Sequence, residues 1–171
     1  MNARLPKGLF LILAVCASIY FSHYYPLLPR VIASHFDRHG FANGWQTKQR
    51  FFEFLGGMTL LSAFFVFAIP AIISVMPRQL VNLPNKEYRL APEQRTASMQ
   101  FLNAWFAWFG CAVYAVILLT FDYAVQTNLH SPYGPNPARL WYTLIAFAGF
   151  AFIWTIRLFG RFGRVPGNPA A

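Results

Sequence analysis

Charged residues are scarce in this chain of 171 residues: Asp, Glu, Lys and Arg make up 11% of it, and only five residues are acidic. Hydrophobic residues account for 57% and aromatic residues for 19%. A water-soluble domain of this size cannot bury so much apolar surface, because its interior is limited by the ratio of volume to surface. The composition therefore excludes an ordinary soluble globule and indicates an integral membrane protein.

Motifs of catalysis are missing as well. The chain has no HExxH, GxSxG or P-loop pattern, so the sequence does not indicate a zinc protease, a serine hydrolase or a nucleotide-dependent enzyme. Cysteine is rare, and Cys16 and Cys111 both lie near the middle of apolar stretches, where packing is a commoner role than a disulfide. Catalysis stays open, and a non-catalytic role is the simpler expectation.

Basic residues outnumber acidic ones by 14 to five, which gives a net charge of +9. They lie in short connectors between apolar stretches rather than along one exposed face. That distribution is typical of membrane proteins and disfavours a nucleic-acid partner. The lipid bilayer is the first partner that the sequence predicts, and a homo-oligomer stays open.

Four apolar stretches are long enough to cross a bilayer, which takes about 20 helical residues. They lack the alternation of barrel strands, and backbone groups in lipid must be bonded within each segment, so we expect helices. A cleaved signal is the alternative for the first stretch, and bulky Val15 disfavours it. The prediction is an all-α integral membrane protein, a single membrane domain over 1–171, with transmembrane helices at about 8–28, 53–77, 96–123 and 140–162.

Prolines mark two irregular points along these helices. Pro70 should kink the second span, and Pro92 fits the first turn of a helix that leads into the third. If the N-terminus is inside, nine basic residues lie on the inner side and five on the outer side. That asymmetry predicts both termini in the cytoplasm, an outer loop at 29–52 and an inner loop at 78–95.

The outer loop is rich in turn-forming residues, so we expect it to be structured. Residues 31–36 have the composition of an extended segment, Gly40 permits a positive φ, and Asn43 with Gly44 is a tight-turn signal. Trp45, near the second span, suits an interfacial anchor.

Two groups of loop residues carry a resemblance to a known family. The outer loop has His35, Asp37, Gly40, Asn43, Trp45 and Lys48; the inner loop has Asn82, Pro84, Asn85, Lys86, Tyr88 and Pro92. In type and order they resemble the domain of unknown function of SdpI-type bacterial membrane proteins, with Asn43 where an acid is common. Together the two motifs cover about a fifth of the chain.

The resemblance implies a multi-pass protein of a bacterial inner membrane with a binding or signalling role. The SdpI-type proteins protect a bacterium from a secreted peptide toxin and hold a transcriptional repressor at the membrane, and their full architecture has six spans. For this four-span chain we expect the outer loop to recognise a peptide, a lipid or an envelope partner. The basic inner loop, with Tyr88, suits anionic lipid headgroups or a cytoplasmic protein partner.

The alternative is a metal-binding protein or a metal-dependent membrane enzyme. In the predicted topology all four histidines and three of the five acids lie near the outer side, and imidazole and carboxylate groups are ligands of Zn²⁺. The candidate metal ligands are His35, Asp37, His39, Asp122 and His130.

A structural role is the simpler interpretation of the same residues. His35 and Asp37 would then bond the backbone of their own loop and Lys48, forming a cap over the helices. Asp122 would pair with a basic neighbour such as Arg139 at the interface.

Overall fold

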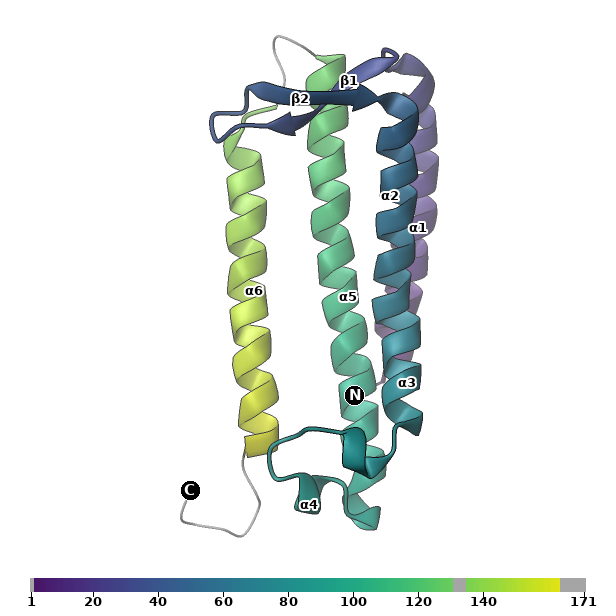
Figure 1. Cartoon of the computed structure of the whole chain (residues 1–171), viewed down its shortest axis with the longest axis vertical. Coiled ribbons are helices and arrows are strands. Elements are labelled where there is room, and N and C mark those ends of the chain that lie inside the picture. Colours follow the sequence, from purple (N-terminus) through teal and green to yellow (C-terminus); the bar gives the residue numbers. More distant parts are fainter. Residues whose placement is uncertain (1, 131–134, 164–171) are drawn as a thin grey trace.

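The computed structural model describes residues 2–130 and 135–163 and is mostly helical (78%). In Figure 1 the long helices run side by side, with a β-hairpin across one end of the bundle and a short helical loop at the other. The elements, with η for 3₁₀- or π-helical turns, are α1 (Arg4–Tyr24), η1 (Tyr25–Leu27), β1 (Val31–Phe36), β2 (Ala42–Thr47), α2 (Lys48–Ala63), η2 (Phe64–Ala68), α3 (Ile69–Val75), η3 (Arg78–Leu80), α4 (Lys86–Arg89), α5 (Pro92–Leu129) and α6 (Ala138–Gly163).

The prediction of four spans is confirmed at the level of length and composition. Among the described residues, four helical stretches are long and apolar enough to cross a membrane: Arg4–Leu27, Lys48–Val75, Pro92–Leu129 and Ala138–Gly163. Pro92 is the first residue of α5, as predicted. This helix has 38 residues and is therefore about 57 Å long at ~1.5 Å per residue, well beyond a hydrocarbon core of about 30 Å.

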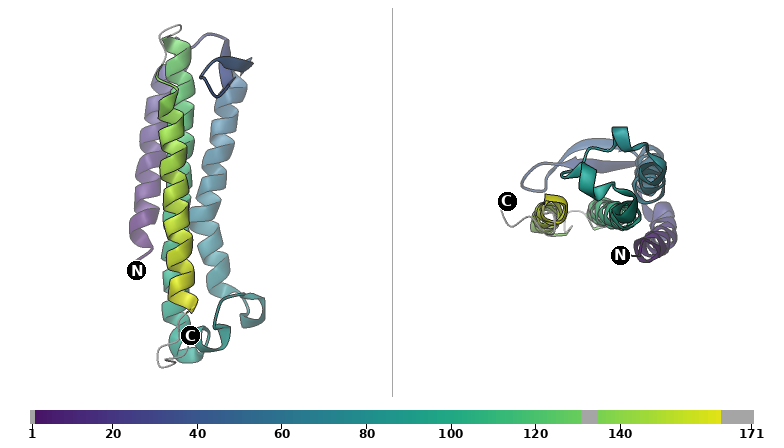
Figure 2. Two further views of the ribbon diagram at one scale, coloured as in Figure 1. Left: turned by 90° about the vertical axis from the view of Figure 1, so that its left-hand side faces the viewer. Right: turned by 90° about the horizontal axis from the view of Figure 1, so that it is seen from below.

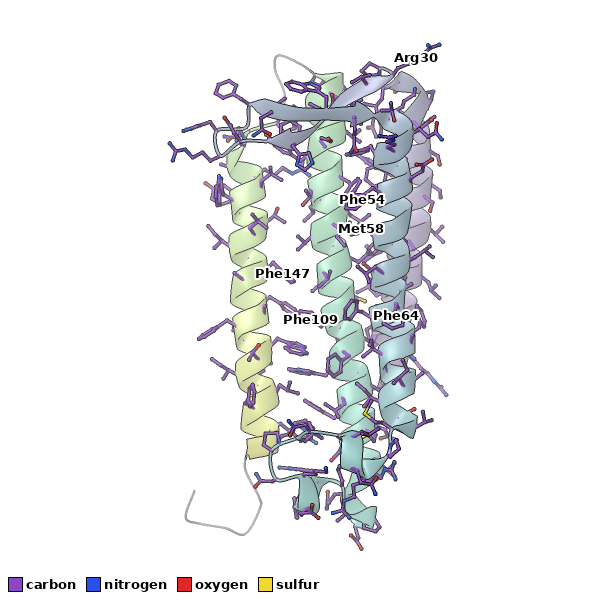
Figure 3. All side chains as sticks on the ribbon, viewed as in Figure 1. Arg30, Phe54, Met58, Phe64, Phe109 and Phe147 are labelled. Atoms are coloured by element: carbon purple, nitrogen blue, oxygen red, sulfur yellow. The ribbon has the colours of Figure 1, made fainter. Side chains whose placement is uncertain are left out.

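Helix α5 is the centre of the bundle. Seen from below, it lies between α6 on one side and α1 with α2 and α3 on the other (Figure 2). Aromatic side chains join α5 to α6: the rings of Phe109 and Trp154 are 4.7 Å apart, and those of Trp105 and Trp154 are 5.8 Å apart. Figure 3 shows Phe147 of α6 beside Phe109 in the same space. Phe162 is the one residue of α6 that is buried, so most of this apolar helix is left uncovered by the protein.

The second span is irregular where Pro70 lies. Proline has no N–H to donate, and its ring clashes with the carbonyl four residues earlier, here that of Val66. The chain forms the π-helical turn η2 just before Pro70, so the expected disturbance takes this form. Gly110 of α5 accommodates it, since a Cβ there would lie 2.6 Å from Cγ2 of Val66.

The connection between the first two spans is a β-hairpin, so the all-α description fits the spans and not this connection. Val31 pairs with Thr47, and Phe36 with Ala42, with bulges around His35. The expectation of a tight turn at Asn43 and Gly44 was wrong, because both residues lie inside β2.

Candidate functional site

The turn of the hairpin is made by Asp37 and Gly40. The Asp37 carboxylate accepts hydrogen bonds from the backbone N–H of His39 at 2.8 Å and of Phe41 at 2.9 Å. The backbone N–H of Phe41, followed by that of His39, holds the pKa of this carboxyl below its usual value. Gly40 has the predicted positive φ, 85°. This local bonding places the turn at residues 37–40, ahead of the Asn43-Gly44 pair.

The hairpin is fastened to α5 by Asn128. The backbone N–H of Ala33 donates to Oδ1 of Asn128 at 2.8 Å, and Nδ2 of Asn128 donates back to the Ala33 carbonyl at 2.8 Å. Next to them Ile32 is fully buried in a core with Phe51 of α2 and Phe121 of α5. Asn128 belongs to neither of the two loop motifs. In the sequence it is a single amide residue near the end of an apolar stretch, and that pattern does not indicate a binding partner.

The far end of the hairpin is fastened to α6. A Cβ on Gly40 would lie 2.2 Å from Cγ of Pro137, so the turn packs directly on the residue before α6. The indole Nε1 of Trp141 also donates to the Arg38 carbonyl at 3.4 Å. The hairpin therefore spans the end of the bundle from α2 to α6 (Figure 1).

Lys48 fixes the base of the hairpin. Its Nζ donates to the carbonyls of Tyr25 and Leu28, each at 3.0 Å, and lies 4.7 Å from the centre of the Tyr25 ring. Lys48 was expected to bond His35 and Asp37. In the structure it bonds instead the backbone carbonyls that follow α1.

The outward face of the hairpin, turned away from the helices, carries exposed apolar side chains beside the exposed polar residues Asn43 and Thr47. Val31, Phe41 and Trp45 are 56%, 72% and 62% exposed. Next to this outward face in the sequence are basic residues that form no ion pair with a carboxylate in the described part of the chain: Arg30, Arg38 and Arg50. Figure 3 shows Arg30 pointing away from the helices at this end.

The face turned toward the helices covers a cavity of about 410 Å³ between α2, α5 and α6. His35 lines it from β1 and Gln46 from β2. Gly44 makes room for the His35 side chain, because a Cβ at Gly44 would lie 3.0 Å from the Cβ of His35 and 3.2 Å from Cδ2 of its imidazole ring. Aromatic residues, among them Phe54 and Phe121, line it from α2 and α5.

Asp122 joins three helices below the hairpin. Its carboxylate accepts a hydrogen bond from the Tyr20 hydroxyl of α1 and pairs with Nη2 of Arg139 of α6 at 2.6 Å. Gln126 donates to the same Tyr20 oxygen at 2.9 Å. The prediction that Asp122 pairs with Arg139 is confirmed.

Four of the candidate metal ligands, Asp37, His39, Asp122 and His130, have partners of their own. His39 accepts from Nε of Arg38 at 3.0 Å, and Nδ1 of His130 lies 3.0 Å from the Gln126 carbonyl oxygen. Within residues 2–130 and 135–163, no three His, Cys, Asp or Glu side chains gather as a metal site would require. The structure thus does not bring together His35, Asp37, His39, Asp122 and His130.

The inner-loop motif holds helix ends. Asn85, at a left-handed φ of 53°, donates from Nδ2 to the carbonyls of Phe162 and Gly163, both at 2.9 Å. Arg89 donates to the Arg161 carbonyl at 2.7 Å, with its guanidinium 5.3 Å from the centre of the Tyr88 ring. Three carbonyls at the end of α6 thereby gain donors that the helix cannot supply.

The other basic residues of this loop are also engaged. Lys86 donates to the Gln79 carbonyl at 3.0 Å, Arg95 to the Met76 carbonyl at 3.3 Å, and Arg78 pairs with Glu87. Their charges remain able to attract anionic headgroups, but their side chains already bond the protein. Of the remaining motif residues, Asn82 and Pro84 lie between η3 and α4, and Pro92 begins α5.

Comparisons of this chain with models of protein families, with curated proteins and with solved structures gave no match.

Proposed function

We propose that the chain is a multi-pass protein of a bacterial inner membrane, with both termini cytoplasmic and the hairpin on the outer side. The four apolar helices and the excess of basic residues at the end opposite the hairpin support it. Of the nine basic residues counted there, Arg164 lies outside the described residues. The loop motifs of the SdpI-type family support the bacterial membrane. A reporter fused after Ala171 should be cytoplasmic, and a periplasmic signal would contradict the orientation.

The proposed activity is binding, and the ligand is an extended peptide segment that carries both acidic and apolar residues. One observation carries this proposal: Val31, Phe41 and Trp45 are more than half exposed on a hairpin that is itself fastened at four places. Large apolar side chains exposed on a fixed element outside the apolar helices are candidates for contact with a partner. Because the hairpin is already held in place by these contacts, binding a ligand would cost less conformational entropy than binding to a mobile loop.

Charge and backbone geometry define the class of ligand. Arg30, Arg38 and Arg50 flank the outward face in the sequence and favour carboxylates in the ligand. The sheet has two strands in the described residues, so β2 keeps one edge without a neighbouring strand. An extended peptide can add to such an edge through main-chain hydrogen bonds.

A displayed library of random peptides, selected against the protein in lipid nanodiscs, tests this function. We expect the enriched peptides to combine Asp or Glu with aliphatic or aromatic residues. A synthetic copy should bind at least about tenfold more weakly to the Phe41→Ala, Trp45→Ala double variant, which corresponds to a loss of about 1.4 kcal/mol.

Gly56→Leu on α2 is the matched control, because its Cβ meets nothing within 4 Å and lies away from the hairpin face. Binding should be unchanged in this variant. Peptides that bind the double variant and the parent protein equally would exclude the hairpin face as the binding surface.

A further inference from the structure

The cavity beneath the hairpin is a second surface, separate from the outward face that carries the proposed peptide binding. We infer that it holds one phospholipid of the surrounding bilayer, with the headgroup against the hairpin and an acyl chain between α2 and α6. This inference rests on the proposed insertion into a membrane and is independent of the peptide ligand.

The hairpin side of the cavity offers unused hydrogen-bonding groups. Ser34, His35 and Gln46 line it, and their side chains form no hydrogen bond within residues 2–130 and 135–163. Polar groups at a protein surface that find no protein partner are available to a ligand. An imidazole, an amide and a hydroxyl together can donate to phosphate oxygens and accept from headgroup hydroxyls.

The helix side of the cavity is mostly apolar, with Thr120 and Tyr123 of α5 as its residues that carry a hydroxyl. Phe51 and Phe54 come from α2, Phe121 and Ala124 from α5, and Leu140 from α6. The cavity volume of about 410 Å³ falls within the range of about 300–1,000 Å³ found for small-ligand sites. Polar groups on one side and apolar groups on the other match an amphipathic molecule.

The position of the cavity selects a lipid among amphipathic molecules. Its walls belong to three of the four stretches that can span a membrane, directly below the hairpin and its Ser34, His35 and Gln46. Phe54 is 55% exposed, so the wall formed by α2 continues onto a face that would meet hydrocarbon. At the depth of this cavity, a bilayer would place a phospholipid headgroup beside the hairpin and the acyl chains beside the helices.

Native mass spectrometry of the detergent-purified protein, with phosphatidylglycerol added as the probe, tests the inference. The parent protein should retain one phospholipid. Thr120→Phe places a ring in the cavity wall at an exposed position of α5, and should lower the retained fraction at least tenfold. The His35→Ala, Gln46→Ala double variant should lose the preference for phosphatidylglycerol over diacylglycerol, which has the chains but no phosphate.

The control is again Gly56→Leu, which blocks a different groove, of about 450 Å³, between α1 and α2. Circular dichroism should show the same helical content in all variants. Unchanged retention in Thr120→Phe, or release by Gly56→Leu instead, overturns the inference. A chain that stays in solution without detergent would instead refute the proposed membrane insertion, so the two failures are distinguishable.

Discussion

Asn128 of α5 and Ala33 of β1 exchange two hydrogen bonds of 2.8 Å each, so an amide side chain takes the place of a neighbouring strand. The bonded residues are 95 positions apart in the sequence. Both surfaces proposed for binding depend on this junction, because it sets the position of the hairpin over the helix ends.

Asn128→Ala should loosen the hairpin. The substitution leaves the N–H and carbonyl of Ala33 without partners in a half-buried place, which costs about 1–3 kcal/mol of unfolding free energy. Hydrogen exchange of residues 31–47, measured by mass spectrometry in detergent, should be faster than in the parent protein. Asn43→Ala, at an exposed position of β2, serves as the comparison and should exchange as the parent does. Equal exchange in both variants would show that Asn128 does not hold the hairpin.

Gly40→Ala should destabilise the turn strongly. At a φ of 85° a Cβ is strained, and here it would also lie 2.2 Å from Cγ of Pro137. The two effects together should cost more than about 2 kcal/mol. Gly57→Ala in α2 is the control: its Cβ meets nothing within 4 Å, and a helical Ala gains about 0.5–1 kcal/mol over Gly. Denaturant titrations of the two variants should shift in opposite directions.

The stability of the turn should depend on pH through Asp37. Its backbone hydrogen bonds, that from Phe41 first, lower the pKa of the carboxyl in the folded state. The stabilisation is therefore complete above the unfolded pKa of about 3.9 and is lost as pH falls through the folded value. Exchange of the Phe41 amide, corrected for its intrinsic pH dependence, should accelerate at acid pH, and Asp37→Asn should remove this dependence. A parent protein whose corrected rate stays constant down to pH 2 would disprove the linkage.

The two ion pairs found within residues 2–130 and 135–163 should differ in strength. The side chain of Asp122 is 15% exposed and also accepts from Tyr20, whereas the pair of Arg78 and Glu87 is 41% and 87% exposed. We expect a coupling energy of about 1–3 kcal/mol between Asp122 and Arg139 in a double-mutant cycle. The exposed pair should give less than about 1 kcal/mol, because solvent screens it. Equal coupling energies would mean that the Tyr20 hydrogen bond adds nothing to the pair that joins α1, α5 and α6.

The sequence predicts the candidate site only in part. Residue type alone points to Gly40, Lys48 and Asn85, and all three have defined structural roles. The sequence pattern did not indicate which carbonyls Lys48 and Asn85 bond. Nor did it reveal the partner of Ala33 or the cavity under the hairpin, since each is made by residues from distant parts of the chain.

The sequence by itself determined the number and places of the four long apolar helical stretches, the disturbance at Pro70 and the start of α5 at Pro92. Hydropathy and the missing N–H of proline are properties of a short segment, so a local pattern is enough to predict their effects. The tertiary structure decided where the hairpin turns, which helix ends are capped and which side chains meet. Those outcomes depend on which donors and acceptors the packed helices bring within about 3 Å of each other, and no local pattern contains that information.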